Sequence, residues 1–467
     1  MSIIFQILHC PVIAAVLLFS GPTAFGQEEL ASPEVERIQL PVSQIDVENA
    51  IGTGGDTLEG AWLQALSVDP GLEASRWQAS AAQRGFCAAK AEKLPMLSAT
   101  SSYNVFDNSL TVQAPVPAVP GVLPAPVTAS VTVNQREFYL GGVRVAQPLY
   151  TFGRIRHAIN AAGAEVTAAV ADEERTELDV KLQVAAAFVG VLQAQRLYEV
   201  AKEGVKDLTE HERVIDNQLN EGVGIRANLL AVQVARANAE QFQLQAENLL
   251  VVSKSTYNRS LQRPLEAAVL LTDLDQPTLQ YDLDLAIGEA MHVRPEIGLL
   301  SAKVRALRSQ ASSVRAASKP QIAVEGGFSY IENRFLAQEA FNNVSVLAEW
   351  NFWDSGRKGN RACQLDHTAE ALLRKRSELE SVITLQVKSA WHTLTASLAR
   401  VDVNRQALES ADENLRVSGN RFVQGEGTNT EVLDAQTLRT AAYSNYYTSL
   451  YAAVLAEMQL RRAVGIL

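Results

Sequence analysis

Residues 155–220 contain no proline and read IRHAINAAGAEVTAAVADEERTELDVKLQVAAAFVGVLQAQRLYEVAKEGVKDLTEHERVIDNQLN. Three glycines interrupt the run, at Gly163, Gly190 and Gly204. The rest is rich in Ala, Leu, Glu, Gln and Arg, which have high helix propensity. One helix over this run would be ~99 Å long at ~1.5 Å per residue, several times longer than an ordinary globular domain needs. Small and apolar residues at a 4-3-4-3 spacing also indicate a coiled-coil seam: Leu178, Leu182, Ala185, Val189 and Leu192.

Both ends of this run recur later in the chain. Residues 217–224 read NQLNEGVG, and residues 420–427 read NRFVQGEG, 203 positions later. At the other end, YTFGR at 150–154 returns as WDSGR at 353–357 with the same offset. We therefore expect a second long helix over about 357–421, matching the first.

Each predicted long helix ends at a Gly-x-Gly sequence, at Gly222/Gly224 and again at Gly425/Gly427. Glycine allows the positive φ that a sharp reversal requires. A shorter helix is expected to return after each turn. The returning helices are predicted over about 227–261 and 430–464.

An earlier segment recurs at a second offset. The residues between Pro70 and Pro95 return between Pro295 and Pro320, 225 positions later, and each copy is predicted to form a helix. Two constant offsets imply one duplication and a length change of 22 residues before Gly153. A repeat of about 200 residues is too long for a solenoid unit. Each half is expected to supply one continuous and one interrupted helical rod, in the structural repeats 57–280 and 281–467.

Between the helices the pattern changes to a period of two. Apolar and polar residues alternate over about 10 residues, which is typical of a strand with one apolar face and matches the length of a transmembrane strand. An equatorial segment is expected over 262–280. The extra 22 residues of the first half contain five prolines and are expected to form an extended, polyproline-like loop. The four strands are predicted over about 96–107, 137–149, 321–332 and 344–353.

The first residues are typical of an exported protein. An apolar run from Val12 to Phe19 is followed by small residues at Ala24 and Gly26, which predicts a signal peptide over 1–26. Residues 27–56 then form an N-terminal linker. The net charge of −11 argues against a nucleic-acid partner.

Four strands are too few to close a barrel. An open sheet in lipid would leave backbone groups unpaired at several kcal/mol each. Three copies would supply twelve strands, which can close, together with twelve helical rods beneath them. The predicted fold class is therefore mainly α with a transmembrane β-barrel: a trimer with a 12-stranded β-barrel continued by a 12-rod α-barrel.

The chain resembles the TolC-like outer-membrane efflux and secretion channels from about Thr57 to its C-terminus. The resemblance implies a homotrimer in the cell outer membrane that extends into the periplasm. It also implies a periplasmic adaptor and an inner-membrane transporter as partners, in an efflux or type I secretion system. The motifs that carry it are Thr57-Leu-Glu-Gly-Ala61 with Asp69-Pro-Gly-Leu72, Leu94-Pro-Met-Leu97, Gln147-Pro-Leu-Tyr150, and Arg421-Phe-Val-Gln-Gly425 followed by Glu431-Val-Leu-Asp-Ala-Gln436.

The resemblance also implies two functional sites at the periplasmic end. Glu431 and Asp434 lie one turn apart on one helix face, where similar proteins carry a carboxylate pair that rings the entrance. Thr428 and Glu431 also fit a capping box, so a structural role is an alternative. Adaptor contact is expected at the two turns, at Gly222, Val223, Gly224, Ile225, Gly425, Glu426, Gly427 and Thr428.

Other residue types indicate no chemistry. Cys87 and Cys363 are predicted near the membrane end of their helices, where a disulfide is conceivable in an oxidising compartment, although small buried cysteines are common. The histidines that follow the predicted signal peptide lie singly on predicted helices, so neither a catalytic set nor a metal or cofactor site is expected. A soluble periplasmic coiled-coil scaffold or adaptor is the alternative function. The cargo, whether drug, metal ion or protein, is left open.

Overall fold

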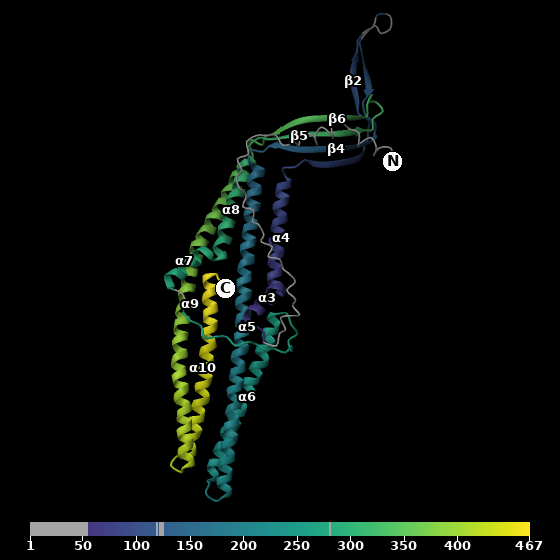
Figure 1. The fold of residues 1–467 in the computed structure, drawn as a ribbon. Coiled ribbons are helices and arrows are strands. Elements are labelled where there is room, and N and C mark those ends of the chain that lie inside the picture. Colours follow the sequence, from purple (N-terminus) through teal and green to yellow (C-terminus); the bar gives the residue numbers. More distant parts are fainter. Residues whose placement is uncertain (1–54, 118–119, 121–125, 280–281) are drawn as a thin grey trace. The chain divides into compact units, whose positions relative to one another are not determined.

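A computed structural model describes residues 55–117, 120, 126–279 and 282–467 of the chain (Figure 1). The predicted signal peptide and nearly all of the predicted linker lie outside these residues. The chain divides into two compact units. Among the described residues, one unit comprises Gln83–Gly163 and Arg305–Ala369, and the other comprises residues 55–82, Ala164–Val304 and Glu370–Leu467.

The first unit contains a four-stranded antiparallel sheet in the order β1-β4-β5-β6. Its strands are β1 (Met96–Val105), β4 (Glu137–Tyr150), β5 (Gln321–Ile331) and β6 (Ala340–Glu349). The strand β6 lies several residues before its expected position at 344–353. Pairing of β5 with β6 ends at Gln321 and Glu349. Pro320 precedes β5 and has no N–H to extend the ladder.

The sheet has one apolar and one polar face. Leu97 pairs with Val145, Val145 with Gly326, and Gly326 with Val344, so these residues share a face. The intervening row, which faces the other way, consists of polar residues and glycine: Ser98, Arg144, Gly327 and Asn343. Within the described residues, β1 and β6 each pair along one side only.

The proline-rich insertion of the first half differs from the expected extended loop. It contains a β-hairpin of β2 (Thr111–Val116) and β3 (Val127–Thr132), which form a separate two-stranded sheet. Pro115 is paired with Thr128 inside this hairpin. A two-stranded sheet leaves one side of each strand unpaired, and a proline without N–H can occupy that side.

The second unit is helical, and several of its helices begin or end in the first unit. The helix α5 (Arg154–Asn220) and its copy α9 (Arg357–Val423) each have 67 residues. Each is followed by a returning helix, α6 (Arg226–Ser260) and α10 (Asn429–Val464). The helices α4 (Pro70–Ala91) and α8 (Pro295–Ala316) have 22 residues each. The short helices α3 (Leu58–Val68) and α7 (Leu283–Val293) precede them.

The core of this unit lies where the short helices meet the long ones. Phe188 of α5 and Tyr257 of α6 are both fully buried and their rings pack edge to face, 5.8 Å apart. Tyr257 donates a hydrogen bond to Asp56, which also pairs with Arg263 at 2.7 Å. A second apolar cluster joins α7, α8, α9 and α10 around Ile383 and Leu460.

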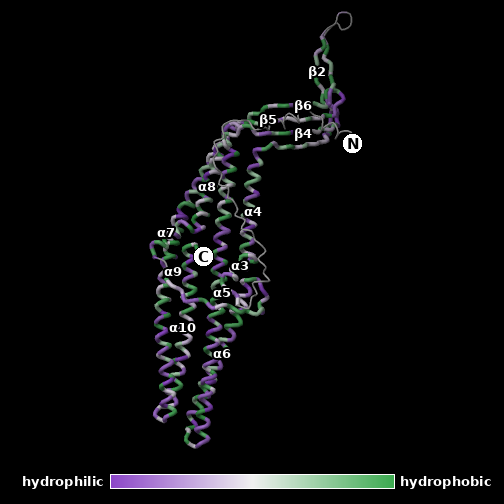
Figure 2. The backbone as a smooth tube through the Cα atoms, in the orientation of Figure 1, coloured by the Kyte–Doolittle hydropathy of each residue, from purple (hydrophilic) through white to green (hydrophobic). Residues whose placement is uncertain are grey.

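Hydrophobic and hydrophilic residues alternate along the long helices (Figure 2). No helix in the described part of the chain is both long enough and apolar enough to span a membrane.

Candidate functional site

The two helix-reversal turns have the same construction. Gly222 and Gly425 both adopt φ of 78°, in the left-handed region. Gly224 follows the first of them, and a Cβ there would lie 2.5 Å from the backbone nitrogen of Leu219. In the second turn, a Cβ at Gly427 would lie 3.0 Å from the nitrogen of Phe422. The first glycine of each pair is therefore required by backbone conformation and the second by close packing.

Apolar side chains project from the ends of these turns. Val223 and Ile225 of the first turn are 76% and 63% exposed, and Val423, the last residue of α9, is 76% exposed. The predicted adaptor-contacting residues thus include an apolar surface in the first turn, whereas the second presents Glu426 and Thr428.

The two predicted carboxylates have different surroundings. Glu431 accepts a hydrogen bond from Arg421 at 3.2 Å and another from the hydroxyl of Thr428 at 3.2 Å. Thr428 is the N-cap of α10 and accepts from the backbone N–H of Glu431. Asp434 is exposed, and within the described residues it has neither an ion pair nor a side-chain hydrogen bond. The charge of Glu431 is therefore neutralised locally, and that of Asp434 is not.

Farther along the helices from the turns, one arginine of α10 joins that helix to both α5 and α9. Arg439 of α10 contacts Asp207 of α5 at 2.7 Å and Asp412 of α9 at 2.7 Å. Tyr443 donates to the second oxygen of Asp412 at 2.9 Å, and Gln436 donates to Asp207 at 3.1 Å. Burial, with help from the adjacent Asp412, raises the pKa of the Tyr443 hydroxyl. We call these five residues the Arg439 cluster.

A second contact joins the two halves closer to the turns. His211 of α5 lies 2.8 Å from the side-chain oxygen of Asn429 in α10 and packs against the ring of Phe422. Asn429 in turn donates to the carbonyl oxygen of Asn228 at 3.3 Å. Burial lowers the pKa of His211, and the hydrogen bond to Asn429 opposes that shift. The imidazole therefore favours its neutral form here.

Neither contact was predicted from the sequence. The duplication relates positions 203 residues apart, whereas Asp207 and Arg439 are separated by 232 residues. The sequence shows that Arg439 lies five positions after Asp434 on the same predicted helix. It does not show which residues of α5 and α9 pair with this arginine.

The cysteines are not bridged. Cys87 and Cys363 are both free thiols, and both are exposed rather than buried. The described residues also contain no group of three or more His, Cys, Asp or Glu side chains that could hold a metal ion.

Known proteins share both sequence and fold with this chain. The outer membrane efflux protein of Brucella suis named BepC is 22% identical over 460 residues, covering 97% of this chain and 90% of that protein. The outer membrane protein TolC of Vibrio cholerae is 23% identical, covering 90% and 94%. The crystal structure of VceC from Vibrio cholerae superposes with a TM-score of 0.70 at 16% identity, covering 87% and 96%.

The family described as outer membrane efflux protein matches residues 63–256 and 286–466, which make up most of the chain and include both long helix pairs. The matched segments contain both turns, Glu431, Asp434 and the Arg439 cluster. The family confirms the predicted class, a transport channel of the outer membrane rather than an enzyme. The chain belongs to the outer membrane efflux protein family.

Proposed function

We propose that three copies of this chain form one channel across the outer membrane and the periplasm, the exit duct of a tripartite efflux or type I secretion system. The observation that carries this proposal is the four-stranded sheet, which has one apolar face and two edges that pair on one side only within the described residues. Its strands have 10 to 14 residues, which suits a tilted transmembrane strand.

Closure with other copies explains both features of the sheet. In lipid, each unpaired backbone group costs several kcal/mol, and three sheets joined at their edges leave none. The apolar row that includes Leu97 and Val344 would then face lipid, and the row that includes Arg144 would face the lumen. Both Leu97 and Val344 are more than 60% exposed in a single copy.

Aromatic side chains at the helix end of the sheet support a membrane boundary there. Phe352 and Trp353 are 80% and 79% exposed, and Phe352 packs edge to face against Trp350. Tyr150 packs in the same way against Phe152. Amphipathic aromatic rings are enriched at both edges of the hydrocarbon region.

The periplasmic end would carry the partner and ion-selecting surfaces. The exposed Val223 and Ile225 suit an apolar helical partner such as the adaptor, which in turn engages the inner-membrane transporter. In a trimer, Asp434 would recur three times around one axis and favour cations in the entrance. Untwisting of the paired helices would then open the channel, and the Arg439 cluster would oppose it by joining α5 to α9 and α10.

Cell fractionation and cross-linking test this proposal. We expect the mature chain in the outer-membrane fraction, as an oligomer that resists SDS at room temperature and dissociates on heating. Lysine-directed cross-linking of the unheated protein should produce a trimer as the largest species. A monomer in the soluble periplasmic fraction would instead support the scaffold or adaptor alternative.

A further inference from the structure

In the second half of the chain, the interrupted rod consists of α10 and α8. Charged side chains fill the junction where the end of α10 meets the start of α8. Arg462 of α10 contacts Glu296 of α8 at 2.9 Å, and Arg294 contacts the same carboxylate at 2.7 Å. Arg294 also donates to Gln386 of α9 at 2.8 Å. Arg294, Glu296 and Arg462 are between 7% and 13% exposed. The carboxylate of Glu296 therefore lies between two guanidinium groups.

The duplication relates each of these residues to one in the first half. The offset of 203 relates Arg462 to Arg259 and Gln386 to Gln183, and both of those residue types are retained. The same offset relates the residues that follow the two returning helices. Gly465 and its counterpart Gln262 both have positive φ, 98° and 53°. The offset of 225 relates Glu296 to Gly71 and Arg294 to Asp69. The first half thus keeps the arginine, as Arg259, but has Gly71 at the position where the second half has Glu296.

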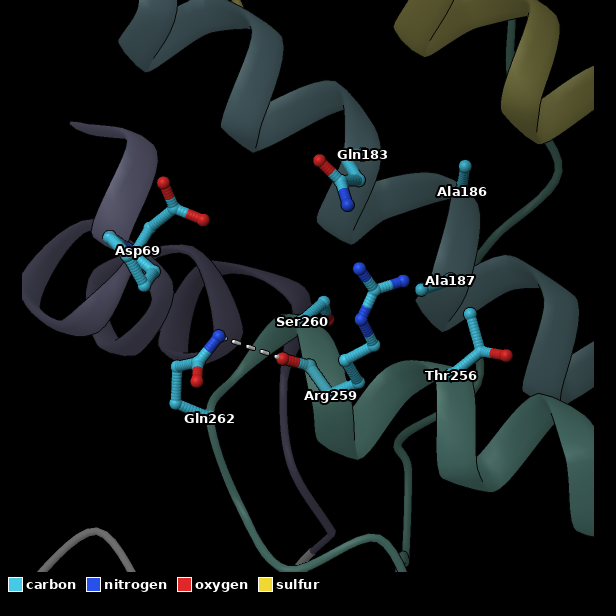
Figure 3. Close-up of a pocket in the computed structure, with 9 residues that line it drawn as sticks. Asp69, Gln183, Ala186, Ala187, Thr256, Arg259, Ser260 and Gln262 are labelled. Carbon is cyan, nitrogen blue, oxygen red and sulfur yellow. Dashed lines mark hydrogen bonds between the residues drawn. The ribbon is translucent and has the colours of Figure 1, made fainter. Parts of the chain in front are cut away.

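A cavity of about 510 Å³, widely open to solvent, lies at this junction in the first half (Figure 3). Its volume falls within the range of about 300–1,000 Å³ typical of small-molecule sites. It is lined by Asp69, Pro70, Gln183, Ala186, Ala187, Thr256, Arg259, Ser260 and Gln262.

The arginine in this cavity has no carboxylate partner. Arg259 is exposed, unlike its buried counterpart Arg462. Its guanidinium extends toward α5 near Gln183 and Ala187 (Figure 3), and within the described residues it makes neither an ion pair nor a side-chain hydrogen bond. Asp69 lies on the α4 side and caps that helix, since its Oδ1 accepts from the N–H of Leu72 at 2.8 Å. The cavity therefore has a cationic group on one side and an anionic group on another.

We propose that this cavity binds a small zwitterion, a molecule with one carboxylate and one ammonium group, such as an amino acid. The ligand carboxylate would take the place that Glu296 occupies in the second half and pair with Arg259, whose planar guanidinium suits a carboxylate. The ammonium would lie toward Asp69. A second carboxylate at that end would be repelled, so dicarboxylates of similar length are disfavoured. This inference does not depend on the proposed trimer or on its partners.

Calorimetric titration of the purified full-length protein in detergent tests the proposal, with 4-aminobutyrate as the probe. We expect saturable binding to the wild type, at least tenfold weaker binding to Arg259→Gln, and unchanged binding to Lys254→Gln. Lys254→Gln is the matched control, because it removes one positive charge from the same helix outside the cavity lining. Glutarate, which has a carboxylate at each end, should bind at least tenfold more weakly than 4-aminobutyrate.

A second variant supplies the missing carboxylate from within the chain. A Cβ at Gly71 would meet only the side-chain Oδ1 of Asp69, at 3.1 Å, so a side chain fits there with a small adjustment. Gly71→Glu should abolish 4-aminobutyrate binding and raise the thermal unfolding midpoint above that of Gly71→Gln. Because a carboxylate in the first turn of α4 also suits the helix dipole, the difference between the two variants should be larger with Arg259 present than in the Arg259→Gln background.

Three results would overturn the proposal: no saturable binding to the wild type, equal binding by Arg259→Gln, or equal midpoints for Gly71→Glu and Gly71→Gln. Glutarate binding as tightly as 4-aminobutyrate would overturn the proposal that the ligand is a zwitterion.

Discussion

Glu296 shows how strongly one buried carboxylate can depend on its partners. Burial alone would raise its pKa, but the hydrogen bonds from Arg294 and Arg462 prevail and lower the pKa from 4.5 to about 2. The folded protein therefore binds this proton less readily than the unfolded chain does. Its contribution to stability is complete above pH 4.5 and is lost as the pH falls toward 2.

We expect Glu296→Gln to destabilise the protein by about 3 kcal/mol at neutral pH, because two buried guanidinium groups lose their shared counter-charge. Thermal unfolding followed by circular dichroism from pH 7 to pH 2 measures this. The wild type should lose its advantage over the variant between pH 4.5 and pH 2. Glu210→Gln, which breaks an exposed pair with Arg213, should behave as the wild type does. A constant difference across the whole pH range would contradict the assignment.

Glu431 and Asp434, the proposed entrance carboxylates, differ at this scale too. We expect Asp434→Asn to reduce the cation preference of the channel by roughly twofold or more, because its charge is not neutralised by a neighbour. Glu431→Gln should change it less, since Arg421 already pairs with that carboxylate. Reversal potentials in planar bilayers under a salt gradient measure both. An equal or larger effect of Glu431→Gln would show that the Arg421 pair does not persist in the open channel.

At the scale of the element, local sequence patterns predicted the positions of the long helices and of their turns. The proline-free run and the duplicated glycines predicted where α5 and α9 reverse, because propensity and turn geometry are local properties. Two features depended on pairing and were predicted poorly. The hairpin β2–β3 forms despite its prolines, and the position of β6 is set by its ladder with β5. The contacts of Arg439 depend on how the helices pack, and no period in the sequence encodes that.

The two glycines of the first turn allow a matched comparison. We expect Gly224→Ala to destabilise the turn by about 1–3 kcal/mol, because its Cβ would clash with the backbone of Leu219. Gly222→Ala should cost only about 1–2 kcal/mol, since its Cβ meets open space and only the positive φ is unfavourable. Hydrogen exchange of the amides from Asn217 to Asn228 measures both. Faster exchange in Gly222→Ala than in Gly224→Ala would contradict this order.

At the scale of the whole molecule, the duplication produces two similar halves that differ at the residues proposed for binding. The first half has the exposed apolar turn and the open cavity at Arg259. The second half has the proposed entrance carboxylates, Glu431 and Asp434, and the filled junction at Glu296. The Arg439 cluster joins the halves, because its arginine and Asp412 belong to the second half and Asp207 to the first. Any movement that separates α5 from α9 and α10 must break it.

We therefore expect Arg439→Gln to raise the single-channel conductance severalfold in planar bilayers. The substitution removes both ion pairs and leaves Asp207 and Asp412 without their shared cation, so that the joined state is disfavoured by about 3 kcal/mol. Tyr443→Phe is the matched control, because it removes one hydrogen bond to Asp412 and leaves both ion pairs intact. It should cost only about 1 kcal/mol and change the conductance little. If Arg439→Gln lowered the thermal midpoint but left the conductance at the wild-type value, the cluster would be a structural contact and the gate would lie elsewhere.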